Sequence, residues 1–409
     1  MPPSLIQRRD LHDGTSLWQT HRVPLPPRAA LRGNPRCDVL IVGAGISGAM
    51  VADALSASGL HVILCDRRPL LQGSTAASTA MVLHEIDTPL SHLVKQLGRK
   101  NAERIWRRSS LAVHALRERA RNLGFDDSIE DSDSLYLQGD MLDAHGLQRE
   151  AAARTRAGFE VEYLNASQVQ AEYGIRRRAG LRTANAFSAD PRVLAAGMLR
   201  AAVARGAQLF SPEEVTEVHA VRGGVRAVTA SGHRIAARHL VFATGYELAH
   251  CVPAAGHRIV STWAIATVPQ RRLPWVRPSL IWEASEHYLY LRTTADGRVL
   301  CGGGDEDFAD ATKRAALLES KRDWLQRRLC TFAPQVDARV AYAWGGSFGI
   351  SAHGLPTIDQ IPGMPRCYAL LGYGGNGITF SMMGAQMLRN VLTGEGDEDL
   401  DLVRFRRAG

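Results

Sequence analysis

The sequence predicts a protein of class α/β plus α+β, with a doubly wound domain next to a second domain built on an antiparallel sheet. Three observations lead to this prediction: a strand–helix–strand unit near the N-terminus, helical periodicity after it, and short segments of alternating hydrophobicity in the second half. The 409 residues are enough for about two or three domains. The chain is therefore expected to bury a large core.

The composition is typical of a soluble globular protein, since hydrophobic residues make up 45% of the chain and charged residues 22%. No run of about 18 apolar residues occurs, so we expect no membrane span. The six cysteines lack the close spacing of a disulfide framework or a zinc site, which favours a reducing compartment and no bound metal. No apolar signal core follows Arg8 and Arg9, and we expect a cytoplasmic protein.

The net charge of +8 does not predict a nucleic-acid partner. The chain has only four lysines, and its arginines are spread along the whole sequence without interleaved aromatic residues that would stack on bases. Solvated surface arginines explain this charge.

The first predicted elements form a parallel βαβ unit after a proline-rich arm over residues 1–35. An apolar strand over residues 37–42 stops at glycines, a helix over 46–58 carries small residues, and a second buried strand covers 61–65. Small residues on the helix allow close packing on a sheet. This unit predicts a parallel sheet covered by helices.

The later elements follow from periodicity and capping residues. Helical periodicity covers residues 93–123, Asp190 and Pro191 provide an N-cap and a first-turn proline for the next helix, and a last helix over 379–392 ends at Gly394. A meander and then a hairpin are expected from the segments with strand-like alternation, which are residues 214–221, 225–229, 234–235, 240–243, 288–292 and 299–301.

A glycine-rich turn joins the first strand to the first helix. Gly43, Gly45 and Gly48 match the pattern GxGxxG, and Asp66 ends the next strand. Glycines at these positions allow a tight turn, a close approach of backbone to pyrophosphate, and packing of helix on strand, while Asp66 accepts from ribose hydroxyls. Arg67 is a candidate for a 2′-phosphate, with an ordinary surface arginine as the preferred alternative. The pattern predicts a Rossmann-like dinucleotide-binding domain.

Three further segments indicate which dinucleotide is bound. A run rich in Ser and Thr covers residues 73–80, the sequence ATG ends a strand at 243–245, and the sequence GGNG precedes the last helix at 374–377. Together with the Gly-Leu-Pro turn at 354–356, these segments resemble the family of FAD-dependent D-amino-acid oxidases, glycine oxidases and sarcosine oxidases. The resemblance extends from about residue 38 to residue 405 and implies that the dinucleotide is FAD.

The resemblance also implies which residues hold FAD. The hydroxyl-bearing run is expected to contact pyrophosphate and ribityl oxygens, the last helix to point its positive end at the flavin, and the strand near Val215 to contact adenine. The expected cofactor residues are Gly43, Gly45, Ile46, Ser47, Gly48, Asp66, Arg67, Ser74, Thr75, Ser78, Thr79, Ala80, Val215, Ala243, Thr244, Gly245, Gly374, Gly375, Asn376, Gly377, Ile378 and Thr379.

The resemblance implies a discontinuous FAD-binding domain. It combines residues 36–90, 186–252 and 338–409, and residues 91–185 and 253–337 form the antiparallel substrate domain. The place of the helix over residues 93–123 is left open.

Relatives move a hydride from the carbon beside nitrogen to flavin N5, and this sequence departs from them in three features. The arginines that bind a substrate carboxylate are replaced by Ala80, Leu83 and Phe348. The lysine that assists reaction with oxygen has no counterpart, and no cysteine lies between Cys330 and Cys367 to tether the flavin. We therefore expect non-covalent FAD, electrons passed to oxygen or another acceptor, and a weakened carboxylate site.

Aromatic residues dominate the candidates for substrate contact. Trp263, Trp344, Phe348 and Tyr373 are expected to line an amine pocket through apolar contact and cation–π attraction. Core packing is the alternative for each of them.

Four residues are candidates for contact with the reacting atoms. Tyr288 and Tyr290 share one face of a strand, and either of them corresponds to the family's active-site tyrosine. Arg292, on the same face, is a candidate for a substrate carboxylate, and His84 for flavin or substrate; a surface arginine and a structural histidine are the alternatives. The acidic run at 305–307 is expected to be a solvated turn.

The sequence thus predicts an FAD-dependent amine or amino-acid oxidase or dehydrogenase that acts on a small molecule. The alternatives are a flavin dehydrogenase of a hydroxy acid or polyol phosphate, and a scaffold with structural FAD. Because the carboxylate-binding arginines are replaced, glycine, sarcosine and D-alanine are expected to reduce the flavin more slowly than bulkier amines.

Overall fold

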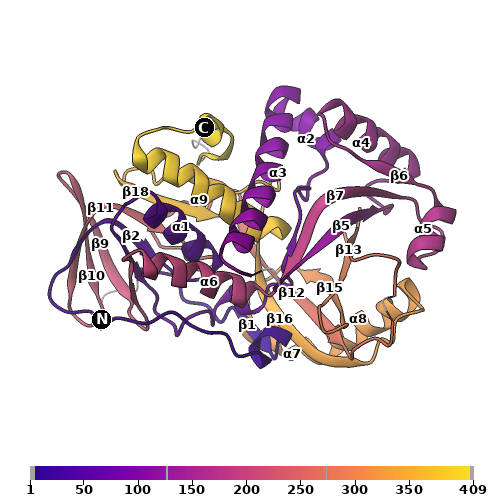
Figure 1. Cartoon of the computed structure of the whole chain (residues 1–409), viewed down its shortest axis with the longest axis horizontal. Coiled ribbons are helices and arrows are strands. Elements are labelled where there is room, and N and C mark those ends of the chain that lie inside the picture. The colour runs from indigo at the N-terminus through magenta and orange to yellow at the C-terminus, as the bar shows by residue number, and fades with distance from the viewer. Residues whose placement is uncertain (1–4, 126–127, 273, 406–409) are drawn as a thin grey trace.

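The computed structural model describes residues 5–125, 128–272 and 274–405. Within these residues the chain forms two sheets of eight and ten strands, with helices packed around them (Figure 1). The two sheets confirm the predicted fold class. No helix of the described ranges is long and apolar enough to span a bilayer.

The smaller sheet is the doubly wound part of the molecule. Its order is β17 (Thr357–Gln360), β18 (Cys367–Leu371), β11 (Arg234–Phe242), β2 (Arg36–Val42), β3 (Val62–Cys65) and β8 (Gln208–Phe210). Its strands β18, β11, β2, β3 and β8 are parallel, whereas the edge strand β17 pairs antiparallel with β18. The antiparallel meander β9 (Val215–Val221) and β10 (Gly224–Thr229) extends from β11.

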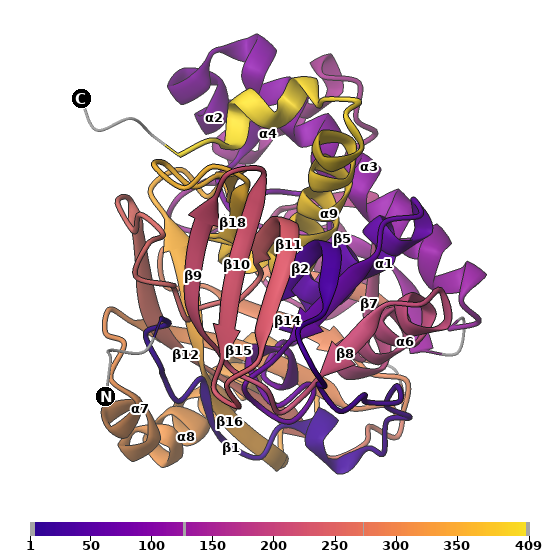
Figure 2. The same ribbon diagram turned by 90° about the vertical axis from the view of Figure 1, so that its left-hand side faces the viewer.

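The two faces of this sheet are covered differently. One face packs against α1 (Ile46–Ala57), α6 (Pro191–Ala204) and α9 (Gly377–Thr393), with Val39, Ile41 and Leu64 in one continuous core. The other face carries Leu40 and Val42 in a core with the β9–β10 meander. Figure 2 shows the meander on the side opposite these helices. The alternating side chains of parallel strands are therefore buried on both faces, as their apolar sequences require.

The larger sheet is mostly antiparallel, with β13 and β5 as its parallel pair. Its order is β1 (His12–Gly14), β16 (Val340–Ser351), β12 (His257–Thr267), β15 (Val299–Glu306), β14 (Leu289–Thr293), β13 (Ser279–Glu283), β5 (Ile129–Leu137), β7 (Gly180–Ala189) and β4 (Met81–Val82), and β6 (Glu162–Leu164) pairs with β7.

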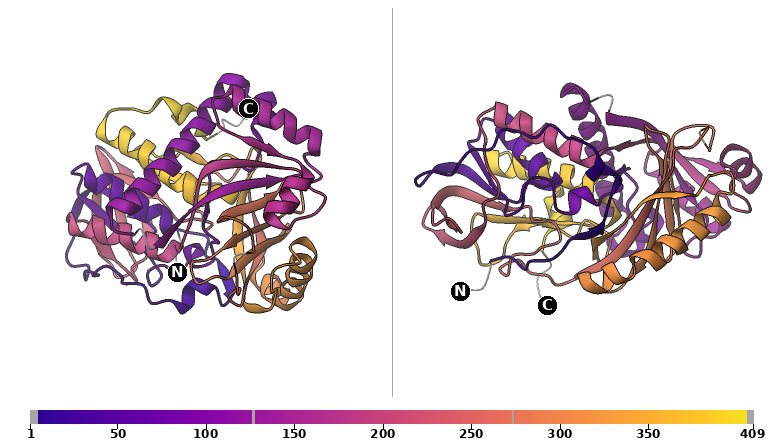
Figure 3. Two further views of the ribbon diagram at one scale, coloured as in Figure 1. Left: turned by 45° about the vertical axis from the view of Figure 1, so that its right-hand side comes forward. Right: turned by 90° about the horizontal axis from the view of Figure 1, so that it is seen from below.

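Helices cover this larger sheet as well. Leu325 and Leu329 of α8 (Leu318–Phe332) pack with Ile265 and Cys301 of the sheet, and Figure 3 shows α8 lying along its outer face. The remaining helices of this part are α2 (Leu90–Leu97), α4 (Ala144–Arg156), α5 (Ala166–Tyr173) and α7 (Ala311–Ala316).

Several predicted elements are confirmed with their capping residues. The Asp190 side chain accepts from the amides of Arg192 and Val193 at the start of α6. Strands β14 and β15 pair as the expected hairpin, and α9 ends before Gly394, which has a φ of 89°. Residues 234–235 and 240–243, predicted as two strands, form the single strand β11.

The helix predicted over residues 93–123 is interrupted. Gly98, with a φ of 76°, separates α2 from α3 (Arg99–Asn122). Ile105 and Val113 of α3 belong to the same core as α1 and α9, so this helix packs on the parallel-sheet side. In Figure 1 it stands between the two sheets.

The strands divide between the sheets differently from the expected residue ranges. Strands β4 and β16 lie in the antiparallel sheet, although 36–90 and 338–409 were assigned to the nucleotide-binding part. Strand β7 crosses the expected boundary at residues 185 and 186, and β1 brings the N-terminal arm into the larger sheet. A single predicted range can therefore contain strands of both sheets. The amino-acid composition of a range does not reveal where the chain passes from one sheet to the other.

Candidate active site

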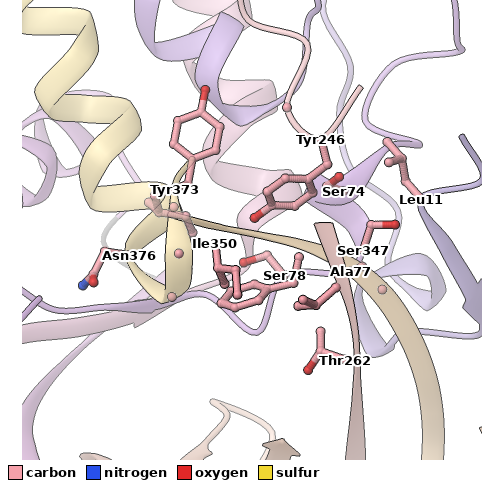
Figure 4. A pocket seen from close by; sticks show the side chains of 18 of the residues that line it. Leu11, Ser74, Ala77, Ser78, Tyr246, Thr262, Ser347, Ile350, Tyr373 and Asn376 are labelled. Atoms are coloured by element: carbon pink, nitrogen blue, oxygen red, sulfur yellow. The ribbon is translucent and has the colours of Figure 1, made fainter. Parts of the chain in front are cut away.

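A cavity of about 720 Å³ lies between the two sheets. Its lining combines the glycine-rich turn after β2, the start of α9 and strands of the larger sheet. Figure 4 shows side chains from these separate segments around one space, with Ser74 and Tyr246 on one side and Thr262 on another. We call the part with Gly43, Gly45, Asp66 and Ser74 the cofactor end. We call the part with Asp87, Tyr136, Arg258, Trp282, Tyr288, Tyr290 and Asp305 the substrate end.

The glycine-rich turn at the cofactor end has no room for a side chain at Gly43 or Gly48. A Cβ at Gly43 would lie 2.4 Å from the Ala243 carbonyl oxygen, and one at Gly48 would lie 1.9 Å from that of Gly43. Gly43 also has a φ of 105°, which favours glycine. The Ala44 amide donates to Asp66 Oδ2 at 2.7 Å and fixes that carboxylate beside the turn. The backbone can therefore approach a pyrophosphate as the motif requires.

The hydroxyl-bearing run lies against this turn. Thr75 Oγ1 accepts from the Ile46 amide at 3.0 Å, while Ser74 Oγ is buried, lines the cavity and has no hydrogen-bond partner among the described residues. A buried hydroxyl without a partner is costly, so a bound group with polar oxygens fits here. This observation supports a phosphate or ribityl group at the site.

The N-terminal arm holds the same run from outside, which sequence reasoning did not predict. Ser16 Oγ donates to the Ala76 carbonyl at 2.6 Å, and Trp18 Nε1 donates to that of Ser78 at 2.7 Å. Trp344 Nε1 donates to the Ala77 carbonyl at 2.9 Å. Three side chains from distant segments thus fix the backbone of one loop.

The start of α9 forms the other wall of the cofactor end. Asn376 Nδ2 donates to the Glu85 carbonyl at 2.7 Å, and the Gly375 amide donates to Asp87 Oδ2 at 2.7 Å. The positive end of α9 therefore faces the cavity, where it stabilises negative charge.

Nearly all expected cofactor residues line the cavity, and Gly48 and Thr379 do not. Gly48 acts through packing, and Thr379 Oγ1 donates to the Leu83 carbonyl at 2.9 Å. Arg67 lines the cavity but pairs with Glu247 at 2.5 Å, and Arg68 pairs with the same carboxylate at 2.6 Å. Glu247 therefore occupies one donor nitrogen of the Arg67 guanidinium.

The expected aromatic residues are brought together by the fold. The six aromatic residues named from the sequence, which are Trp263, Tyr288, Tyr290, Trp344, Phe348 and Tyr373, all line the cavity. The rings of Tyr288 and Tyr290 lie 6.0 Å apart, and the Tyr288 hydroxyl donates to Asp305 Oδ2 at 2.9 Å. Trp344 and Tyr373 also donate to backbone carbonyls, so they serve packing as well as lining.

Arg292 does not line the cavity, contrary to its expected role. Its buried guanidinium donates to the carbonyls of Thr79, Thr293 and Ala189 at 2.7, 3.2 and 2.9 Å. Burial lowers the pKa of this guanidinium to about 10. The residue fixes backbone and has no free donor pair for a substrate carboxylate.

His84 is also absent from the lining. Its ring is buried and stacks on Phe159 at 5.4 Å, with Trp106 at 6.1 Å. Burial lowers the pKa of this imidazole, and the Glu85 carboxylate opposes the shift. The structure therefore favours a structural role for His84 over contact with flavin or substrate.

Several residues of the substrate end were missed. Tyr136 and Trp282 stack at 4.0 Å, and the carboxylates of Asp87 and Asp305 face the cavity. Asp305 is half-buried rather than part of a solvated turn, which corrects the expectation for the acidic run. The only sequence signal for Asp305 is the preceding run of three glycines, which marks an irregular strand. Asp87 has no such signal.

The carboxylates of the substrate end are perturbed by their surroundings. Desolvation raises the pKa of Asp87 to about 6; the Gly375 amide opposes this shift, and the charge of Asp305 adds to it. Desolvation also raises the pKa of Asp305, against the effect of the Tyr288 hydroxyl and the Lys321 charge. Desolvation raises the pKa of the Tyr288 phenol well above its ordinary value, so this hydroxyl keeps its proton.

These features define a dinucleotide-dependent oxidoreductase, and the comparisons with known proteins identify its family. The sequence profile described as FAD dependent oxidoreductase matches residues 38–390, so the chain belongs to this family and is an enzyme that uses FAD. The family resemblance inferred from the sequence is thereby confirmed.

Two relatives match most of the chain at low identity. A probable oxidoreductase, OrdL, of Rhizobium meliloti is 24% identical over 402 residues, covering 95% of this chain and 90% of the relative. The bifunctional protein MnmC of tRNA 5-methylaminomethyl-2-thiouridine biosynthesis from Burkholderia mallei is 25% identical; 92% of this chain matches 59% of that protein. The chain therefore spans about three fifths of the length of MnmC.

The crystal structure of glycine oxidase from Geobacillus kaustophilus superposes with a TM-score of 0.74 at 18% identity, covering 92% of this chain and all of that one. The agreement extends over both sheets and supports the fold.

Proposed function

We propose that this enzyme oxidises the carbon–nitrogen bond of an amine and passes the electrons from FAD to oxygen or another acceptor. One observation carries this proposal. Among the described residues that line the cavity, Arg258 is the one arginine outside the cofactor end, and its side chain is mostly exposed and ion-paired with Asp307, so it offers no buried guanidinium. A carboxylate or phosphate substrate needs a free guanidinium for bidentate binding, whereas an amine does not.

The aromatic lining supports the same choice. Tyrosine rings attract an ammonium group, and the stacked Tyr136 and Trp282 provide apolar surface for the rest of an amine. FAD, when bound, supplies the acceptor for a hydride from the carbon beside nitrogen. The residues of the chain hold and orient the amine, and the protonated Tyr288 hydroxyl keeps its hydrogen bond to Asp305.

The alternatives make different demands on the cavity. A hydroxy acid or a polyol phosphate is an anion, and the carboxylates of the substrate end repel it. A structural role for FAD does not explain the polar and aromatic lining of the substrate end. It also predicts that no substrate reduces the flavin.

Anaerobic mixing of the FAD-loaded enzyme with three panels tests the proposal: amines, amino acids, and hydroxy acids with polyol phosphates. Bleaching of the flavin by amines, with release of ammonia or a smaller amine, is the expected result. Bleaching by hydroxy acids or polyol phosphates with a ketone as the only product would overturn the proposal, and so would the absence of bleaching in all panels.

A further inference from the structure

We propose that Asp305 and Tyr288 hold the ammonium group of the substrate, so that the enzyme selects amines without a carboxylate beside the nitrogen. This inference rests on the proposed function and names the residues that determine its substrate class. It is carried by the position of Asp305 in the fold, by the one oxygen of its carboxylate that has no hydrogen bond of normal geometry among the described residues, and by a second carboxylate that lines the same cavity.

The position of Asp305 results from a bulge in β15. Trp263 pairs with Gly303, whereas Ser261 pairs with Glu306, so β15 has one more residue than β12 between these pairs. Gly303 and Gly304 have φ values of 138° and 71°, which favour glycine. A bulge redirects the side chains next to it, and here Asp305 joins the cavity lining beside Thr262.

The Asp305 carboxylate is only partly satisfied within the protein. Its Oδ2 accepts from Tyr288, but its Oδ1 is buried beside Thr262 without a hydrogen-bond partner of normal geometry among the described residues. Lys321, whose charge lowers the pKa of Asp305, donates through Nζ to Glu306 Oε1 and to the Gly304 carbonyl, both at 2.7 Å. Leaving a carboxylate oxygen buried and unpaired is unfavourable, and a ligand N–H removes this cost.

A second carboxylate adds to the negative potential at this place. Asp87 lines the same cavity, and the charge of Asp305 raises its pKa. The charges of both carboxylates also raise the pKa of the Tyr288 phenol. Two carboxylates in one desolvated space repel each other, and a bound cation reverses this repulsion. Within the described ranges no three His, Cys, Asp or Glu side chains gather as a metal site requires, so the cation we propose is organic.

The tyrosine rings complete the site. The ring centroids of Tyr288 and Tyr290 lie 6.0 Å apart at the substrate end, and aromatic rings attract a bound cation. An amino acid would place its carboxylate next to its ammonium and therefore close to Asp305. The same arrangement that attracts an amine thus disfavours an amino acid.

The test compares a charged probe with its neutral analogue in the FAD-loaded enzyme. Binding of 2-phenylethylamine and 2-phenylethanol is followed through the absorption spectrum of the oxidised flavin in wild type, Asp305→Asn and Asp305→Glu. We expect Asp305→Asn to weaken binding of the amine about tenfold or more, since a charge-assisted hydrogen bond contributes about 1.5–3 kcal/mol. Binding of the alcohol is expected to stay within about twofold, and Asp305→Glu to retain part of the affinity for the amine.

Asp323→Asn is the matched control, because Asp323 lies on α8 with about half of its side chain exposed and outside the cavity lining. It should leave both affinities unchanged, and flavin content and melting temperature report on folding of each variant. Equal affinity for the amine in wild type and Asp305→Asn, or failure of wild type to prefer the amine, would overturn the inference. Amine-dependent bleaching unaffected by Asp305→Asn would overturn it while leaving the proposed function intact.

Discussion

The two ends of the cavity are built in different ways. The cofactor end is formed by backbone: the glycine-rich turn at Gly43 and Gly45, the loop at residues 73–80 and the start of α9. The substrate end is formed mainly by side chains on or next to β5, β12, β13, β14 and β15, whose meeting depends on the register of a long sheet. Backbone geometry serves a cofactor common to the family, and in the proposed function the side chains on the larger sheet select the substrate.

The largest expected effect concerns how the cofactor end holds FAD. Cys65 is the one cysteine among the described lining residues, and burial raises the pKa of its thiol so that no thiolate forms a tether. Heat or acid is therefore expected to release all of the flavin into the supernatant. Flavin fluorescence on the protein band of a denaturing gel would contradict this.

A charge placed in the glycine-rich turn should abolish FAD binding at the cofactor end and leave the substrate end unchanged. Gly45→Asp brings a carboxylate to the place where the pyrophosphate approaches, and like charges at contact cost several kcal/mol. We expect the affinity for FAD to fall about a hundredfold or more.

Gly45→Ala is the control, because its Cβ would meet only Thr75 Oγ1, at 3.1 Å. It should keep most of the flavin, and circular dichroism should show that both variants are folded. Normal flavin stoichiometry in Gly45→Asp would mean that the phosphate site is elsewhere.

A substitution of Arg292 tests whether this residue lies outside the substrate end, as the structure places it. Arg292→Ala leaves three buried carbonyls without their donor, so we expect the free energy of unfolding to fall by about 2–4 kcal/mol. Arg277→Ala removes an exposed pair with Asp133 at 3.3 Å and should cost less than about 1 kcal/mol. Denaturant titration of both variants measures the difference. Unchanged stability with loss of sarcosine oxidation would make Arg292 a carboxylate anchor after all.

The pH dependence of amine binding gives a smaller effect at the substrate end. The pKa of Asp87 is raised to about 6, so its negative charge is present above this pH and lost below it. An alkylamine stays protonated throughout, and its affinity should therefore fall as the pH drops below about 6, by at most tenfold per pH unit. Among the described titratable groups, the charge of Asp305 acts on Asp87, and the charge of Asp87 raises the pKa values of Tyr136, Tyr246 and Tyr288.

Spectral titration of 2-phenylethylamine between about pH 5 and pH 8 measures this change, with Asp87→Asn as the comparison. The variant should bind more weakly at the higher pH and lose the fall near pH 6. The same pH profile in both proteins would show that Asp87 does not contribute to the site.

The sequence was sufficient for the cofactor end, because its determinants are local. The turn at Gly43, the helix after it and Asp66 lie within one βαβ unit, and the spacing of the glycines has a direct steric meaning. The N-terminal arm was not predicted to hold the loop, because the contact of Trp18 with Ser78 joins two segments without any shared pattern.

The substrate end could be predicted only in part. Alternation along a strand correctly placed Tyr288 and Tyr290 together, but extending it to Arg292 was wrong, because the strand has left the cavity there and packs under residues 79 and 189. Asp305 was missed because a bulge breaks the alternation of β15. Bulges and sheet register depend on partner strands, which a single sequence does not show.

The central claim is that the substrate end binds an amine and not an amino acid. Its most direct test is the anaerobic rate of flavin reduction by a matched pair, 2-phenylethylamine and phenylalanine of either chirality, with sarcosine as the small reference. Loss of a bidentate arginine contact is worth about 1.5–3 kcal/mol, so we predict that the amine reduces the flavin at least about tenfold faster than phenylalanine or sarcosine. Equal or faster reduction by phenylalanine or sarcosine would contradict the claim and make this enzyme an amino-acid oxidase.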